Sequence, residues 1–82
     1  MKVLYFAWVR QKVGTSAETI DADGVGNVRA LAEHLRARGG GYAEAFGDLS
    51  RLRAAVNQEH VSLDSPLRPG DEVAFFPPVT GG

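Results

Sequence analysis

The stretch NVRALAEHLRARG, residues 27–39, decides the fold class, because it predicts the main helix of the chain. Its apolar residues recur at the spacing of a single helix face, and these are Val28, Leu31, Ala32 and Leu35. Asn27 is a suitable N-cap, since its side-chain oxygen can accept an amide hydrogen of the first turn. Gly39 supplies a left-handed stop. We therefore expect a helix of about three turns here.

Residues 3–9 are rich in β-branched and aromatic residues and predict a strand,. Further strands are expected at residues 16–20, 52–57, 60–63 and 72–76. Proline and glycine predict turns at residues 64–66 and 68–71. We interpret Gly39-Gly40-Gly41 as a flexible hinge, followed by a single helical turn over residues 42–46.

This order of elements predicts an α+β fold of the ubiquitin-like β-grasp type, with a mixed sheet of four to five strands covered on one face by one main helix. Strands and helices do not alternate as repeated βαβ units, which argues against a doubly wound parallel sheet. At 82 residues the chain is large enough for a single small core,. We expect residues 1–76 to form the β-grasp domain and residues 77–82 to form an extended C-terminal tail.

The second face of such a sheet needs an explanation, because one helix shields only one face. The predicted strand at residues 3–9 is apolar on both sides, with Leu4, Phe6 and Trp8 alternating with the other side chains. A contiguous exposed apolar patch usually marks a partner surface. Either a protein partner docks on this face, or loops and the turn at residues 42–46 cover it.

The composition excludes several classes of function. The formal net charge is -1 and the basic residues form no stripe, so a nucleic-acid partner is not expected,. The longest apolar run, residues 3–9, is far shorter than the ~20 residues of a spanning helix, and the N-terminus does not resemble a signal peptide. We therefore expect no membrane partner and a cytoplasmic location. Without cysteine, the chain has no disulfide, thiolate ligand or thiol nucleophile,.

The polar residues predict neither a metal site nor a catalytic site of the chain's own. His34 and His60 are far apart in sequence and lack ligand-spaced neighbours,. Asp71-Glu72 is interpreted as a solvated turn, with charge-guided docking as the alternative. The short Asp21–Gly24 and Gly24-x-Gly26 patterns lack the remaining positions of a calcium loop or a phosphate-binding loop. No Ser-His-acid arrangement is visible.

The C-terminal segment carries the functional hypothesis, because residues 73–82 contain no charged side chain and end in Gly-Gly. Pro77 and Pro78 cannot donate ladder hydrogen bonds, so the last strand must end near Phe76 and the following residues project from the body. Gly81 and Gly82 lack a Cβ and can thread a narrow channel. A chance Gly-Gly or a cloning remnant would not explain the proline pair.

The terminal carboxyl group is the reactive group that such a tail would present. Its ordinary pKa near ~3.5 makes it an anion and a poor electrophile at neutral pH. An ATP-using partner enzyme would have to convert it to an acyl-adenylate. A sulfur donor would then displace the adenylate and leave a thiocarboxylate.

Three segments give the chain a family resemblance: Ala55-Val56-Asn57-Gln58-Glu59, Pro66-Leu67, and GDEVAFFPPVTGG at residues 70–82. Together with residues 3–7 and 9–10, they closely resemble the small, sulfur-carrier subunit of molybdopterin synthase. The resemblance spans nearly the whole chain, and its specific part is the acidic turn followed by the Phe-Pro-Pro-Val-x-Gly-Gly tail.

The resemblance implies that Gly82 is adenylated by a ubiquitin-activating-like adenylyltransferase and then thiocarboxylated with sulfur from a donor enzyme. It implies insertion of the tail into the large synthase subunit, with these residues entering: Phe76, Pro77, Pro78, Val79, Thr80 and Gly81. The sulfur would pass to cyclic pyranopterin monophosphate, two loaded carriers supplying the dithiolene of molybdopterin. The implied assembly is a heterotetramer built on a large-subunit dimer, which carries the catalytic side chains.

The resemblance implies no permanently bound cofactor, since the ATP is consumed by the activating enzyme. Other functions stay open at the level of sequence. One is a sulfur carrier for thiamine or another thiolation pathway, although that carrier lacks the proline pair. Another is a noncatalytic ubiquitin-like adapter or modifier, which would act through its sheet or by conjugation to lysines. An enzyme with its own pocket is the third.

Overall fold

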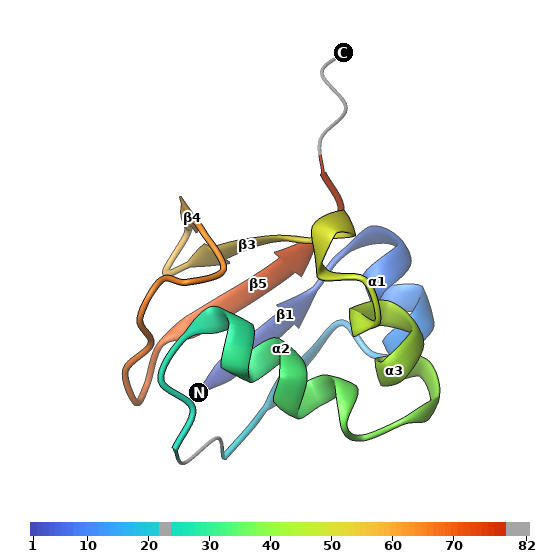
Figure 1. The fold of residues 1–82 in the computed structure, drawn as a ribbon, viewed down its shortest axis with the longest axis horizontal. Helices are drawn as coiled ribbons and strands as arrows, with labels where there is room; N and C mark the ends of the chain where they lie inside the picture. The colour runs from blue at the N-terminus through green and yellow to red at the C-terminus, as the bar shows by residue number, and fades with distance from the viewer. Residues whose placement is uncertain (22–23, 79–82) are drawn as a thin grey trace.

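A computed structural model describes residues 1–21 and 24–78 of the chain (Figure 1). Five strands form one mixed sheet in the order β2-β1-β5-β3-β4. The strands are β1 (Lys2–Tyr5), β2 (Ala17–Thr19), β3 (Arg53–Val56), β4 (Glu59–Val61) and β5 (Glu72–Phe76). β5 lies in the middle, parallel to β1 and antiparallel to β3. The predicted α+β fold with a mixed sheet is thus confirmed.

The predicted main helix is α2 (Val28–Arg36), and its cap is the expected one. The Asn27 side chain accepts a hydrogen bond from the amide of Ala30 at 2.8 Å,. The four residues of the predicted apolar face are all buried. Figure 1 shows the reason, since α2 lies across the sheet in front of β1. Gly39 has the predicted positive φ, at 78°, although α2 itself ends earlier, at Arg36.

The predicted strand over residues 3–9 is wrong beyond Tyr5. The chain turns at Ala7, whose φ is 53°, and enters the helix α1 (Ala7–Val13). In this helix Val9 is buried and Val13 half-buried, while Arg10 and Lys12 face solvent. The valines are four residues apart, the spacing of one helix face. The apolar run concealed this pattern, because its first half is a strand and its second half a helix.

The glycine run is also different from the prediction. Gly39-Gly40-Gly41 is not a hinge, because α3 (Gly40–Phe46) begins at Gly40 and includes Gly41. A Cβ at Gly41 would overlap the carbonyl oxygen of Lys12, near the end of α1. Here glycine is needed for a close approach of two helices rather than for flexibility. The short 3₁₀ helix η1 (Leu49–Arg51) then leads into β3.

One hydrophobic core fills the space between the helices and one face of the sheet. Phe46 of α3 packs edge-to-face on Phe75 of β5, with ring centroids 5.0 Å apart, and also on Tyr5 of β1. Since Phe46 lies on the same side as α2, the turn at residues 42–46 does not cover the second face. The part of that alternative that assigns the turn to the second face is wrong.

The second face of the sheet carries a row of small and apolar side chains across all five strands. Strand register places in this row Ala17, Leu4, Ala74, Ala55 and His60. Leu4 and Ala74 are half-buried and His60 is exposed. None of the row's half-buried or exposed members belongs to the core cluster of the described residues. The docking alternative for this face stays a prediction.

A tight turn joins β3 to β4 and ties both to the start of β5. Asn57 and Gln58 have φ values of 51° and 70°, the left-handed pair typical of a two-residue hairpin turn,. The Asn57 side chain donates to Asp71 and accepts from the amide of Glu72, each at 3.0 Å. The hairpin therefore fixes the point at which the central strand begins.

Candidate functional site at the end of the central strand

The predicted tail starts at the end of β5, the middle strand of the five. Phe75 and Phe76 are paired with β3, where Arg53 lies opposite Phe76. The carbonyl oxygen of Phe75 accepts a hydrogen bond from the amide of Phe6 at 3.1 Å. Figure 1 shows β5 running to the end of the sheet, from which the chain continues. The base of the tail is therefore held on both sides.

The two phenylalanines at this end face opposite sides of the sheet, as neighbours on a strand do. Phe75 is fully buried in the core, whereas Phe76 is half-buried on the second face. The imidazole of His60 lies against the Phe76 ring, with centroids 5.1 Å apart. Pro77 and Pro78 follow outside any strand and are half-buried. The sequence predicted the end of the strand at Phe76 correctly.

The remaining predicted site residues, Val79, Thr80, Gly81 and Gly82, lie outside the described residues. Of the tail that we predict to insert into a partner, the structure therefore describes only the base, Phe76 to Pro78. In the described part, Phe76 is paired with β3 at the end of the central strand, and Pro77 and Pro78 follow it half-buried outside the sheet.

The surroundings of the tail base were not predicted, because α1 and η1 were not predicted. Phe6 is 48% exposed, the only exposed large hydrophobic residue in the part of the chain described. Trp8, the second residue of α1, lies under the guanidinium of Arg51, which is 5.3 Å from the ring centroid,. The available signal was the sequence Phe6, Trp8 and Arg10, two aromatic residues and one basic residue at every second position.

A second cluster of titratable groups lies on the helix side of the sheet, and no pattern in the sequence predicted it. The carboxylate of Glu18 on β2 accepts hydrogen bonds from Tyr5, Tyr42 and Arg38, the last at 2.8 Å. Burial alone would raise the pKa of Glu18, but these donors outweigh it and lower the pKa,. The pKa of Tyr5 is raised, mainly by burial. The cluster joins β1, β2 and α3.

Asp71 has a structural role, in agreement with the interpretation of Asp71-Glu72 as a turn. Its carboxylate accepts hydrogen bonds from the amide of Arg68 at 2.8 Å and from the Asn57 side chain at 3.0 Å. The amide of Arg68 and the Asn57 side chain lower the pKa of this carboxyl group,. The residue therefore stays ionised and closes the turn before β5.

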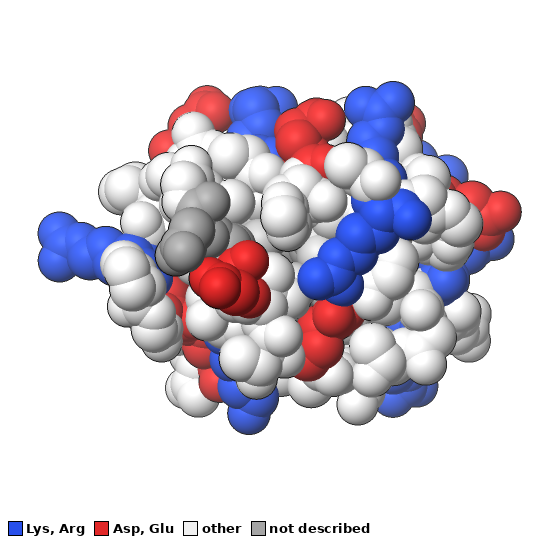
Figure 2. All heavy atoms as spheres, turned by 90° about the horizontal axis from the view of Figure 1, so that it is seen from below, with Lys and Arg blue, Asp and Glu red and all other residues white. Residues whose placement is uncertain are grey.

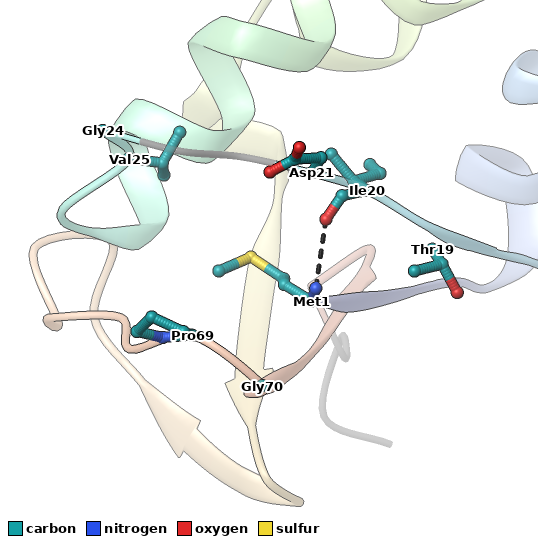
Figure 3. A pocket seen from close by; sticks show the side chains of 8 residues that line it. All are labelled: Met1, Thr19, Ile20, Asp21, Gly24, Val25, Pro69 and Gly70. Carbon is teal, nitrogen blue, oxygen red and sulfur yellow. Dashed lines mark hydrogen bonds between the residues drawn. The ribbon is translucent and has the colours of Figure 1, made fainter.

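A shallow hollow of about 440 Å³ lies at the opposite end of β5 from the tail (Figure 3). Its lining combines apolar groups with one carboxylate: Met1, Thr19, Ile20, Asp21, Gly24, Val25, Pro69 and Gly70. The amine of Met1 donates a hydrogen bond to the carbonyl oxygen of Ile20 at 3.0 Å. This amine is thus engaged in joining β1 to β2, and the hollow contains no residue of the predicted site.

Charges and potential metal ligands are scattered over the molecule. Figure 2, which views the molecule from below, shows basic and acidic side chains next to one another. Within residues 1–21 and 24–78, no three metal-ligating side chains come together. His34 lies on α2 and His60 on β4, on different elements, as the sequence indicated. No helix of these residues has both the length and the apolar character of a membrane span.

Comparison with known proteins gives consistent relatives. The chain is 55% identical over 82 residues to the molybdopterin synthase sulfur carrier subunit of Escherichia coli K12, covering 100% of this chain and 99% of the relative. A putative molybdopterin converting factor subunit 1 from Pyrococcus furiosus superposes with a TM-score of 0.76 at 37% identity, covering 95% of each chain.

A third relative was solved in an assembly, a protein-protein complex of subunits 1 and 2 of molybdopterin-converting factor from Helicobacter pylori. One of its chains superposes with a TM-score of 0.65 at 26% identity, covering 99% of this chain and 96% of that one. The ThiS family matches residues 3–82, from the first strand through the terminal glycines. The chain therefore belongs to the ThiS family.

Proposed function

We propose that this chain is the sulfur-carrier subunit of a molybdopterin synthase. The observation that carries the proposal is the family match through Gly82, which coincides with a tail base held at the end of the central strand. The similarity to the sulfur carrier subunit of E. coli over nearly its full length supports the same function. The working group is the α-carboxyl group of Gly82.

The chemistry consists of two displacements at this carboxyl group. A carboxylate oxygen attacks the α-phosphorus of ATP, pyrophosphate leaves, and an acyl-adenylate forms. Hydrosulfide supplied by a donor enzyme then attacks the acyl carbon, and AMP leaves with the electrons of the original C–O bond. The carbon then carries one sulfur in place of one oxygen, and the proton of the hydrosulfide passes to solvent. The acceptor of this sulfur is cyclic pyranopterin monophosphate.

The contribution of the chain is presentation rather than catalysis. The hydrogen bond from Phe6 to Phe75 and the pairing of Phe76 with Arg53 hold the base of the tail. Pro77 and Pro78 favour extended backbone and cannot continue the ladder, which directs the chain away from the sheet. Gly81 and Gly82 are narrow enough for a partner's catalytic cleft. The catalytic side chains belong to that partner.

The proposal includes three protein partners: the large synthase subunit, an adenylyltransferase of the ubiquitin-activating type, and a sulfur donor enzyme. The complex of subunits 1 and 2 from H. pylori supports the first of these. We further propose a heterotetramer around a large-subunit dimer, a cytoplasmic location, and no cofactor held by this chain. ATP is consumed by the activating enzyme.

Intact-mass spectrometry tests the function directly. The chain is incubated with its activating enzyme, ATP and a sulfur donor, next to a variant that lacks Gly82. We expect the wild-type mass to rise by one oxygen-to-sulfur exchange and the variant mass to stay unchanged. A wild-type mass that does not change, with partners able to load an E. coli carrier, contradicts the proposal. Covalent adducts on lysines of other proteins would instead indicate a modifier.

A further inference from the structure

Three arginines lie around the base of the tail, and we call them the arginine collar: Arg10, Arg51 and Arg53. All three side chains are exposed. Arg53 pairs with Phe76 in strand register, and Arg51 lies over Trp8 of α1. Arg10 lies one helical turn after Phe6. The amide of Arg10 donates a hydrogen bond to the carbonyl oxygen of Phe6. Arg53 and Arg51 thus lie beside aromatic residues near the base of the tail, Phe76 in strand register and Trp8 in side-chain contact.

The collar arginines differ from three of the other four arginines in their charge partners. Four basic side chains elsewhere form ion pairs with acidic ones: Lys12 with Glu44, Arg29 with Asp64, Arg36 with Glu33, and Arg38 with Glu18. Arg68, in the turn before β5, forms none within the described part of the chain. Among the residues that the structure describes, no collar arginine takes part in such a pair. Asp48 interacts electrostatically with Arg51, and its carboxylate also accepts two hydrogen bonds from Ser50. The charge balance at this end is positive.

Two collar side chains are held in place before any partner arrives. The Arg53 guanidinium donates to the carbonyl oxygens of Leu52 at 2.9 Å and Ser50 at 3.4 Å. Arg51 is held over the Trp8 ring at 5.3 Å. A cation fixed in this way loses less side-chain entropy on binding than a free one. The collar is therefore suited to interact with fixed charges on a partner.

Arginine also suits the reactive end that the collar surrounds. An acyl-adenylate is attacked by free amines, whereas a guanidinium stays protonated and is not a nucleophile at neutral pH. The two lysines are elsewhere: Lys2 lies opposite Glu72 at the far end of β5, and Lys12 pairs with Glu44. The collar therefore carries positive charge without an amine.

We infer that the arginine collar docks on an acidic rim around the cleft of the large subunit that receives the tail. This inference rests on the proposed function and adds the chemistry of the partner surface. Complementary charge steers a diffusing carrier so that its tail meets the cleft, and salt screens this attraction. Unpaired, exposed arginines next to the apolar Phe6 fit this role, because their charge is not already neutralised.

The test measures the association rate of the loaded or unloaded full chain with its large subunit, between about 0.05 and 0.5 M salt. In the double variant Arg51→Gln/Arg53→Gln we expect about a 10-fold slower association at low salt and a flatter salt dependence. The matched control, Arg29→Gln/Arg36→Gln, removes the same charge from ion pairs away from the tail. It should stay within about twofold of wild type.

A second variant separates charge from shape and folding. Arg51→Lys/Arg53→Lys keeps the charge, so we expect it to retain most of the wild-type association rate at low salt. Wild-type binding with an association rate that neither salt nor the collar variants change would overturn the inference and leave the proposed function intact. A wild-type chain that never binds the large subunit, at any salt concentration, would overturn both.

Discussion

At the scale of the residue, Ala7 decides where the first strand ends and the first helix begins. It has a φ of 53°, a left-handed conformation that costs an L-residue about 1–2 kcal/mol,. Its neighbour Phe6 has extended backbone and its side chain is exposed at the base of the tail. The strain at Ala7 thus accompanies the change of direction that positions Phe6 and Trp8.

Replacing Ala7 with glycine should therefore increase the free energy of unfolding by about 0.5–1 kcal/mol, because glycine adopts positive φ without a steric cost. Urea unfolding measures the change. The matched control is Ala30→Gly in α2, where the backbone is an ordinary helix and a loss of up to ~1 kcal/mol is expected. If both variants lose the same stability, Ala7 is not strained.

The residue scale also shows what the sequence could and could not predict. The end of the last strand at Phe76 was predicted from the residues that follow it, because prolines have backbone preferences that do not depend on the rest of the fold,. Alanine has no preference for the left-handed region, so the positive φ of Ala7 depends on tertiary packing,. The boundary between β1 and α1, and with it the collar residue Arg10, was therefore missed.

At the scale of the element, the periodic segments were predicted well and the close contacts between elements were not. The helix α2 has a full apolar face and a side-chain cap, both local signals,. The contact of α1 with α3 depends on two segments far apart in the sequence, Lys12 and Gly41. A glycine needed for such a contact looks the same in sequence as one in a flexible hinge.

Gly41→Ala should destabilise the protein by about 1–3 kcal/mol, since the new Cβ must push the Lys12 carbonyl and separate α1 from α3,. Gly26→Ala is the control, because a Cβ there meets nothing within 4 Å and the backbone is not left-handed. That variant should stay within about 0.5 kcal/mol of wild type. Chemical denaturation gives both values, and equal effects would show that α1 and α3 yield without cost.

In the molecule as a whole, the two ends of the sheet carry different structural features. One end holds the tail base and the collar, and the other carries the turns, the N-terminal amine and the hollow. The central strand β5 runs between them and is paired on both sides. A partner that pulls on the tail therefore pulls on the middle strand of the sheet, which is hydrogen-bonded to β1 and to β3.

The Glu18 cluster makes the stability of this whole assembly depend on pH, because it joins β2 to β1 and α3. The folded-state pKa of Glu18 is lowered, so its stabilisation is complete above the unfolded value of roughly 4.3 and is lost as the pH falls through the folded value,. We expect Glu18→Gln to lose about 1–3 kcal/mol at neutral pH, the usual effect of breaking hydrogen bonds to a charge.

This difference should shrink as the pH falls below about 4, because the wild-type carboxylate is then protonated as well. Asp48 and Asp71, whose pKa values are also lowered, are present in both proteins and cancel in the comparison. Urea unfolding of the two proteins across the acid range measures the gap. A gap that stays constant or widens on acidification would mean that the hydrogen bonds of Glu18 do not depend on its charge.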